Sequence, residues 1–355
     1  MKSKIAYIPL VLLGLGILLT GCATGMTPSS WPGVAADAER AYIAFANHVY
    51  AVDLRDGDEL WRFPEKANNA KLFFAPPVLT PDGQLIIGGY DHILYSLDPE
   101  NGQVNWQFEG ARDRWIGEVL VANDTIYAPN ADYKMYALDL DGRLQWTFEA
   151  DQSLWAAPVT DGEAIFFGAL DHFVYALNAS TGELIWKTEL NGAVMGCPAL
   201  SSEGLLYIGT FQHTLFALDS TRGNILWEFP TEGWLWSGPA LNGENLYLGD
   251  SEGRFYAVNA LDGSEAWEQR PNGPILGLPL FINETVIFGT ESGTVYAFDM
   301  NGETIWDKTL PGQVYGPAIP AGELILIGQV GEQGTPILVA LDQNGVQQWT
   351  FTPVK

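Results

Sequence analysis

Cysteine is almost absent from this chain of 355 residues, which contains only Cys22 and Cys197. If Cys22 is used at the N-terminus, Cys197 has no intramolecular partner, so the fold cannot depend on a disulfide. Cys197 stands in the apolar segment Met195-Gly196-Cys197-Pro198. This setting is typical of a small buried side chain and not of a reactive thiol.

Basic residues are scarce as well, because 17 Lys and Arg stand against 43 Asp and Glu, a net charge of −26. A protein that binds nucleic acid neutralises phosphates with Lys and Arg, so this balance excludes nucleic acid as a partner. The acidic residues are scattered through turn segments and form no block. They predict a solvated, repulsive surface, with docking onto a basic partner as the alternative.

Histidine is rare, and no catalytic motif accompanies the 4 His residues. His92, His172 and His213 each stand three residues before an aromatic residue, at a place that Gly253 and Gly293 occupy in other repeats. Because Gly replaces His there, we expect a tight left-handed turn and not a metal ligand. The sequence has no Gly-x-Ser-x-Gly elbow, phosphate loop or His-Glu-x-x-His motif, so it predicts neither catalysis nor a metal site.

One long apolar run occurs at the N-terminus, from Ile5 to Leu19, with Lys2 and Lys4 before it. This layout predicts a secretory signal peptide at residues 1–21, and the run is too short for a confident spanning helix. The sequence Leu19-Thr20-Gly21-Cys22 resembles the lipobox of bacterial lipoproteins. That resemblance implies a lipidated Cys22, a linker over residues 22–30 and an anchor in a lipid bilayer.

Glycine and tryptophan are abundant, with 39 Gly and 13 Trp, and Gly-x-x-x-Trp recurs eight times. The eight pairs are Gly57/Trp61, Gly102/Trp106, Gly142/Trp146, Gly182/Trp186, Gly223/Trp227, Gly263/Trp267, Gly302/Trp306 and Gly345/Trp349. A period of about 40 residues is typical of propellers and other repeat folds. Each unit contains short apolar runs separated by Gly- and Asn-rich turns, which predict four antiparallel strands. We expect the first strand at residues 156–159 in one unit and at 238–241 in another.

Eight such units predict an all-β, eight-bladed β-propeller over residues 31–355. A single four-stranded sheet cannot bury both faces, so consecutive sheets stack, and a ring leaves few free edges. We expect each repeated Trp to fill the space between adjacent blades and each repeated Gly to adopt a positive φ in a turn. The turn residues expected to accept hydrogen bonds from nearby amides include Asp98, Asp139, Asn178 and Asp219.

Units such as Tyr175-Ala176-Leu177-Asn178-Ala179-Ser180-Thr181-Gly182, followed by Trp186, resemble the pyrroloquinoline-quinone-type propeller repeat over residues 31–351. A lipoprotein signal before one such propeller is similar to the BamB-like lipoproteins, scaffold proteins of the outer-membrane β-barrel assembly machinery. Quinoprotein dehydrogenases share the repeat, and resemblance to them would imply an adjacent cysteine pair and calcium ligands around a quinone. Cys197 has no neighbouring cysteine, and no calcium set can be matched, so we expect no cofactor.

Bulky apolar residues recur just before the predicted first strands. The position three residues before the Pro, or its equivalent, carries Phe74, Trp115, Trp155, Met195, Trp236, Leu276 and Val314. Chain direction places these side chains at the same end of the ring as the histidine turns, around the central channel. They fill the mouth of a wide ring, or they form an aromatic binding mouth for an extended peptide or another apolar-faced ligand. The candidate binding face is Phe74, Trp115, Trp155, Met195, Trp234 and Trp236.

These observations predict a non-enzymatic scaffold of the cell envelope that binds an envelope or membrane protein, with a β-barrel assembly component as the candidate that the resemblance implies. The anchor would lie in the outer membrane facing the periplasm, or on the outer face of the cytoplasmic membrane. The alternative is a propeller that binds a quinone or another small ligand, as a sensor or a quinoprotein-type oxidoreductase.

Overall fold

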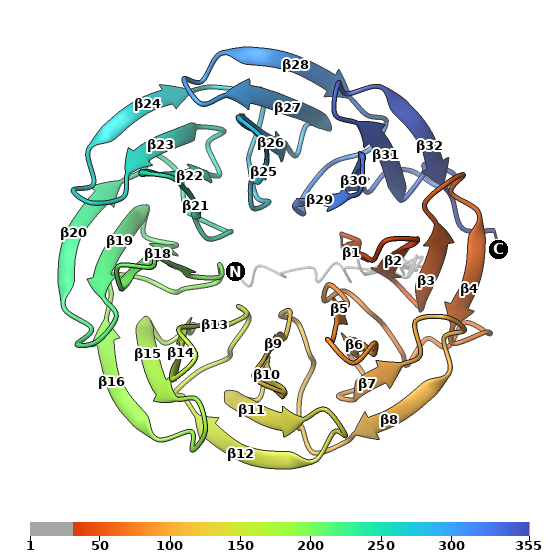
Figure 1. Cartoon of the computed structure of the whole chain (residues 1–355), viewed down its shortest axis with the longest axis horizontal. Helices are drawn as coiled ribbons and strands as arrows, with labels where there is room; N and C mark the ends of the chain where they lie inside the picture. The colour runs from red at the N-terminus through yellow and green to blue at the C-terminus, as the bar shows by residue number, and fades with distance from the viewer. Residues whose placement is uncertain (1–30, 355) are drawn as a thin grey trace, which may run out of the picture.

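The computed structural model describes residues 31–354, and the predicted signal segment and Cys22 lie outside these residues. The described part of the chain is an eight-bladed β-propeller in which each blade is a four-stranded antiparallel sheet (Figure 1). The first blade comprises β1–β4 and the eighth β29–β32, so each blade uses four consecutive strands. Residues 31–354 contain no helix long and apolar enough to cross a membrane.

The strands fall into four concentric sets. The innermost strands are β1 (Gly33–Ala36), β5 (Val78–Leu79), β9 (Leu120–Ala122), β13 (Val159–Thr160), β17 (Ala199–Leu200), β21 (Ala240–Asn242), β25 (Leu280–Ile282) and β29 (Ala318–Ala321). The second strands are β2 (Arg40–Phe45), β6 (Leu85–Gly88), β10 (Thr125–Pro129), β14 (Ala164–Gly168), β18 (Leu205–Thr210), β22 (Asn245–Gly249), β26 (Thr285–Gly289) and β30 (Leu324–Gly328).

The third strands are β3 (His48–Asp53), β7 (Leu94–Leu97), β11 (Lys134–Asp139), β15 (Phe173–Asn178), β19 (Thr214–Asp219), β23 (Phe255–Asn259), β27 (Thr294–Asp299) and β31 (Leu338–Asp342). The outermost strands are β4 (Glu59–Phe63), β8 (Val104–Phe108), β12 (Leu144–Glu149), β16 (Leu184–Glu189), β20 (Ile225–Pro230), β24 (Glu265–Gln269), β28 (Thr304–Thr309) and β32 (Gln347–Phe351). The predicted first strands at 156–159 and 238–241 begin later in the structure, with β13 at Val159 and β21 at Ala240.

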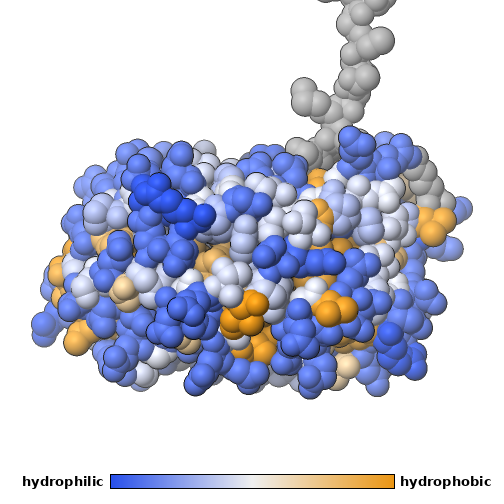
Figure 2. All heavy atoms as spheres, turned by 90° about the horizontal axis from the view of Figure 1, so that it is seen from above, coloured by the Kyte–Doolittle hydropathy of each residue, from blue (hydrophilic) through white to orange (hydrophobic). Residues whose placement is uncertain are grey.

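Burial differs between the inner and outer strands for a simple geometric reason. The second and third strands are covered on both faces by neighbouring blades, so their sequences are continuous apolar runs. An example is β14 (Ala-Ile-Phe-Phe-Gly), which is buried throughout. The outer strands diverge at the rim, and β16 alternates between exposed and half-buried residues. Figure 2 shows the resulting disc from the side, hydrophilic over most of the visible face with small separate hydrophobic patches.

Each repeated Trp docks onto the turn of the next blade, as predicted. A Cβ added to Gly182 would lie 2.5 Å from Cε3 of Trp146, so only glycine allows the indole of the preceding blade to lie flat on this turn. Gly182 also has a φ of 71°, which favours glycine. The carboxamide of Asn178 accepts hydrogen bonds from the backbone N–H groups of Ser180 and Thr181, at 3.0 and 2.9 Å, which confirms the predicted turn.

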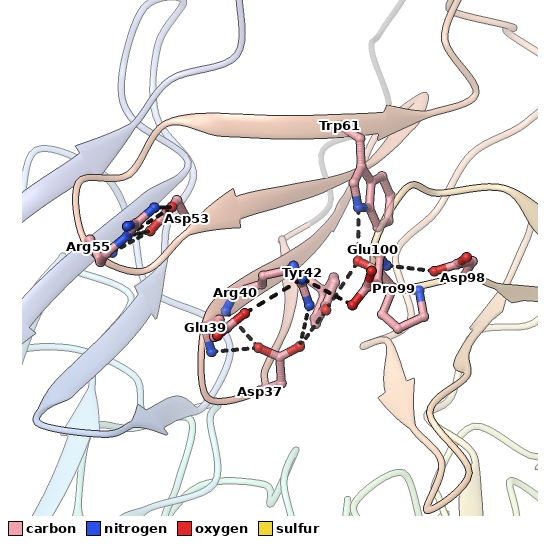
Figure 3. A network of polar contacts seen from close by, with 10 residues as sticks. All are labelled: Asp37, Glu39, Arg40, Tyr42, Asp53, Arg55, Trp61, Asp98, Pro99 and Glu100. Atoms are coloured by element: carbon pink, nitrogen blue, oxygen red, sulfur yellow. Dashed lines mark hydrogen bonds and ion pairs between the residues drawn. The ribbon is translucent and has the colours of Figure 1, made fainter.

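The indole N–H adds a hydrogen bond to most of these docking contacts. Between the first and second blades, Nε1 of Trp61 donates to the Pro99 carbonyl at 3.0 Å (Figure 3). The hydroxyl of Tyr42 donates to Asp37 at 2.6 Å, and Arg40 reaches Glu100 of the second blade at 3.6 Å. Stacked blades are thus joined by side chains and not by shared strands.

The ring closes by the same contact, without exchange of a strand between the first and last blades. Trp349 of the eighth blade donates from Nε1 to the Leu54 carbonyl of the first blade at 2.8 Å. A Cβ on Gly57 would lie 2.7 Å from Cε3 of that indole. Arg62 also donates to the carbonyl of Val354 at 3.0 Å, so the end of the described chain is held against the first blade.

Candidate functional site

The mouth of the channel is defined by strand register. In each blade the repeated Trp faces a small residue of the third strand, such as Ala176 for Trp186. Ala176 pairs with Phe166 of β14, and Phe166 pairs with Val159 of β13. The first-strand residue of this row, Val159 in the fourth blade, sets the register. Four residues before it, the chain enters the blade at one end of the ring. We call the eight residues at that place the mouth ring, which consists of Trp31, Phe74, Ile116, Trp155, Met195, Trp236, Leu276 and Tyr315.

All eight side chains of the mouth ring are apolar or aromatic, and seven of them, all but Phe74, line one cavity of about 190 Å³ at the centre of the ring. Phe74 is 7% exposed, and its ring contacts that of Tyr90 at a centroid distance of 4.6 Å. Trp155, Met195 and Trp236 are half-buried at the mouth. Three predicted binding residues therefore meet around the channel, while Phe74 lies beside it.

The structure places Trp115 elsewhere. Its side chain is 0% exposed and lies in the apolar core between the second and third blades, where it contacts Tyr136 at a centroid distance of 5.5 Å. Ile116, the next residue, occupies the mouth position of the third blade. Val314 is buried in the same way, and Tyr315 takes the mouth position of the eighth blade. Trp115 is therefore a core residue and does not belong to the candidate binding face.

Trp234 extends the mouth outward along the sixth blade. Its ring contacts Trp236 at 5.8 Å and Phe211 at 5.0 Å between centroids, and Phe211 contacts Trp236 at 5.7 Å. Trp31 of the first blade contacts Trp236 at 5.5 Å. The sixth and first blades are not neighbours, so the Trp31 indole extends over the mouth to reach this cluster.

The mouth lies on the predicted end of the ring, together with the turns between second and third strands. The backbone N–H of Val194 donates to the Ala169 carbonyl at 3.1 Å, which ties the segment before β17 to that turn of the preceding blade. His172 in this turn has a φ of 74°, which confirms the left-handed turn predicted from the His and Gly pattern. His92 and His213 have φ values of 70° and 59°. No group of three potential metal ligands occurs among residues 31–354.

Inward of the mouth, the segments of neighbouring blades approach one another so closely that side chains have no room. A Cβ on Gly117 would lie 2.4 Å from the carbonyl oxygen of Trp155, and one on Gly277 would lie 2.3 Å from that of Gly316. A Cβ on Gly196 would meet the backbone of Ser237 at 2.3 Å. These glycines allow the inner segments to form a narrow, continuous wall below the mouth ring.

A second ring follows, two residues beyond the mouth ring, and we call it the channel ring. It consists of Gly33, Pro76, Glu118, Ala157, Cys197, Gly238, Leu278 and Pro317. Glu118 is its one ionisable carboxyl, and burial raises the pKa of that group to about 7. The pKa of the Cys197 thiol is raised to about 12, first by burial and then by the negative charge of Glu118. The thiol is protonated at neutral pH, as expected for a small structural side chain.

Comparison with known proteins identifies the repeat. The family model described as outer membrane protein assembly factor BamB matches residues 46–169, 170–299 and 276–354. The chain belongs to the BamB family. Among solved structures, BamB from Moraxella catarrhalis has the same fold, with a TM-score of 0.68 and 19% identity over 91% of this chain and 94% of that one. A quinohemoprotein alcohol dehydrogenase from Pseudomonas putida gives a TM-score of 0.75 and 15% identity, over 93% and 77% of the two chains.

Sequence relatives of this BamB-family chain include proteins of different kinds. BamB from Yersinia pestis is 24% identical over 155 residues, which is 40% of this chain and 39% of that protein. Tetrathionate hydrolase from Acidithiobacillus ferrooxidans is 25% identical over 138 residues, or 31% and 28% of the two chains. Quinoprotein ethanol dehydrogenase from Pseudomonas aeruginosa is 27% identical over 117 residues, or 28% and 19%. The matches thus span well under two thirds of the length of these relatives.

The channel of this BamB-family propeller does not fit the quinone that the dehydrogenase relatives suggest. Pyrroloquinoline quinone is a polycarboxylate, so a site for it needs cationic side chains or a bound cation. The lining residues within the described part of the chain include no Lys or Arg, and Glu118 contributes a like charge. Cys197 has no cysteine beside it in the sequence. We therefore derive no step of a reaction through a quinone.

Proposed function

We propose that this BamB-family chain is a non-enzymatic scaffold of the cell envelope that holds another envelope protein and takes part in outer-membrane protein assembly. The observation that carries the proposal is the family match, which extends through the propeller from residue 46 to residue 354. The acidic surface supports it, because a net charge of −26 keeps a scaffold soluble and disfavours adhesion to nucleic acid.

The mouth ring is the surface that we assign to partner binding. Trp155, Trp236 and Met195 are half-buried and lie around one concave site, and Trp234 extends that site outward. Aromatic and Met side chains are enriched where a few residues provide most of the energy of protein association. An extended segment with apolar side chains fits such a mouth, because all eight side chains of the mouth ring are apolar or aromatic.

The lipid anchor is a further part of the proposal. Lipidation at Cys22 would leave few residues before Trp31, where the described fold begins, and each residue spans at most about 3.6 Å. The propeller would then stay close to the bilayer. A partner embedded in or resting on the same membrane is the kind that such an anchor favours.

The test is a mild-detergent pull-down of the tagged, full-length protein from its native envelope, followed by mass spectrometry. The proposal predicts a β-barrel assembly protein in fixed proportion to the bait, and a Cys22→Ser variant that is released from the membrane. Recovery of no envelope protein under conditions that preserve other membrane complexes would contradict the scaffold role.

Ligand binding in the channel is the second candidate function, and the cavity of about 190 Å³ is the observation that favours it. A bound quinone would raise the melting temperature by mass action, because only the folded ring has the cavity. No rise at saturating pyrroloquinoline quinone, with and without Ca²⁺, is the result we expect from the charge of Glu118. A clear rise would favour the ligand-binding class and contradict our reading of the channel.

A further inference from the structure

Among the described residues that line the central cavity, Glu118 is the only charged one. At the equivalent place of the channel ring, the other seven blades carry Gly, Pro, Ala, Cys or Leu. The side chain is accessible from the channel. Within residues 31–354 it makes no hydrogen bond and no ion pair. One blade in eight thus places an uncompensated carboxylate where the repeat otherwise has a neutral residue.

The carboxylate is exposed to the channel but enclosed by its walls, and this enclosure disfavours the charged form. The walls of the channel raise the pKa of this carboxyl to about 7, and no described residue that lines the cavity is cationic and able to oppose that shift. No hydrogen bond or ion pair within residues 31–354 compensates the charge of this accessible carboxylate, so it can pair with a cation that enters the channel.

The rest of the cavity is suited to an apolar body. Trp31, Trp155, Trp236 and Tyr315 supply aromatic rings around the mouth, and Met195 adds a polarisable thioether. Aromatic faces attract cations, and the attraction is stronger where water is displaced. The hydroxyl Oγ of Ser237, which also lines the cavity, is buried and has no hydrogen-bond partner among the described residues.

We propose that the channel binds a small organic ammonium ion, with its charged head on Glu118 and its apolar body among the aromatic side chains of the mouth ring. An anion is disfavoured by the like charge of Glu118, and a neutral ligand leaves that charge uncompensated. A cavity of about 190 Å³ accommodates one aryl or short alkyl group beside the ammonium head. This inference goes beyond the scaffold role and does not depend on it.

Binding should depend on pH in a direction that follows from Glu118. The ammonium ion binds the ionised carboxylate, so affinity is close to full above about pH 8 and falls by up to about tenfold per pH unit below pH 7. The other titratable groups at the site do not change charge in this range, because the pKa values of the Cys197 thiol and the Tyr315 phenol are raised above their usual values. Glu291 accepts a hydrogen bond from the Tyr315 hydroxyl at 3.2 Å and adds further negative charge at the rim.

The experiment is a calorimetric titration of the folded protein at pH 8 with three probes of equal size, 2-phenylethylamine, 2-phenylethanol and phenylacetate. We expect binding of the amine, much weaker binding of the alcohol and none of the acid. Glu118→Gln should weaken amine binding by about tenfold or more. Glu163→Gln removes the same charge from an exposed turn between β13 and β14 and should leave binding unchanged.

The same titration at pH 5 tests the role of Glu118 in the wild-type protein, because the amine stays protonated while Glu118 becomes neutral. Loss of affinity at pH 5 in the wild-type protein, together with no pH dependence in Glu118→Gln, is the expected pair of results. Equal binding of amine and alcohol, unchanged binding by Glu118→Gln, or no amine binding at pH 8 would each overturn the proposal. The pull-down of an envelope partner is a separate measurement, so failure here leaves the scaffold role to its own test.

Discussion

Trp31 of the first blade lies edge-on against Trp236 of the sixth, with their ring centroids 5.5 Å apart and their planes at 81°. Trp31 also contacts Tyr315 at 5.9 Å. The contact with Trp236 joins blades that are not neighbours, so one indole at the start of the described fold covers part of the channel mouth. A partner or ligand that enters the mouth must therefore contact Trp31 or displace it.

The different positions of Trp115 and Trp155 lead to opposite expectations for their replacement by Ala. Trp115→Ala should lower the free energy of unfolding by about 3–5 kcal/mol, because it leaves a cavity between two blades at a fully buried site. Trp155→Ala should cost clearly less, because its ring is half-buried at the mouth. Urea unfolding of the two variants checks this order. Equal losses would mean that Trp155 is as much a core residue as Trp115.

The docking of Trp146 onto Gly182 can be separated from the backbone effect of the same glycine. Gly182→Ala places a Cβ 2.5 Å from the indole and also strains a φ of 71°. Gly243→Ala strains a φ of 60° but meets no atom within 4 Å. We expect a loss of about 1–2 kcal/mol at Gly243 and a further 1–3 kcal/mol at Gly182. Equal unfolding midpoints for the two variants would show that the Trp146 indole can move aside without loss of stability.

Trp227 differs from its counterparts because its buried Nε1 has no hydrogen-bond partner among the described residues. Trp186, in the preceding blade, donates from Nε1 to the Ser220 carbonyl at 2.8 Å. Replacement by Phe should therefore cost about 1 kcal/mol more at Trp186 than at Trp227, since both changes remove similar apolar area. Thermal unfolding of the two Phe variants measures the difference. A larger loss at Trp227 would contradict this account.

The contribution of Glu118 to the free energy of unfolding should fall as pH rises from about 4.5 to 7. The pKa of its carboxyl is raised from 4.5 to about 7 in the folded state. As pH rises, the unfolded chain therefore ionises first, and its free energy falls relative to that of the folded ring. Glu118→Gln removes this loss. We expect equal melting temperatures for wild type and variant at pH 4 and a more stable variant at pH 8. A variant that is less stable at pH 8 would mean that the ionised carboxylate stabilises the fold.

The sequence alone predicted the blades because one physical constraint repeats in each of them. Every docking site needs a glycine under an indole, as Gly182 lies under Trp146, so the motif cannot vary without loss of the interface. The turns that require left-handed backbone were found in the same way, from His172 alternating with glycine in other blades. Fold and repeat number were therefore predicted correctly.

The mouth was predicted less completely, because the inner strands carry no invariant residue. Alignment on the proline works where that proline stands directly before the first-strand residue that is level with the repeated Trp, as Pro158 does before Val159. In the third blade Val119 holds that place, and in the eighth Pro317 stands one residue earlier, so Trp115 and Val314 were assigned one position out of register. Counting back from strand pairs would have found Ile116 and Tyr315. Phe211 lies in the turn between β18 and β19, outside the segments that enter the first strands, so the alignment of those segments did not include it.

The ring closure and the reach of Trp31 depend on three-dimensional positions that no local pattern contains. Trp31 precedes the first predicted strand, and nothing in its neighbours indicates contact with Trp236. Glu118 was likewise indistinguishable from the many acidic residues of the turns until strand register placed it in the channel ring. Charge count alone therefore misses the one acidic residue that the channel isolates.

The most direct test of the scaffold account is quantitative mass spectrometry of envelope pull-downs with wild type and a Trp155→Ala/Trp236→Ala double variant. Leu261→Ala, at a site 78% exposed, serves as the matched control. We expect the double variant to stay folded and to lose the β-barrel assembly protein, while the control retains it. Recovery of that partner in unchanged proportion by the folded double variant would contradict the assignment of the mouth ring as the binding surface.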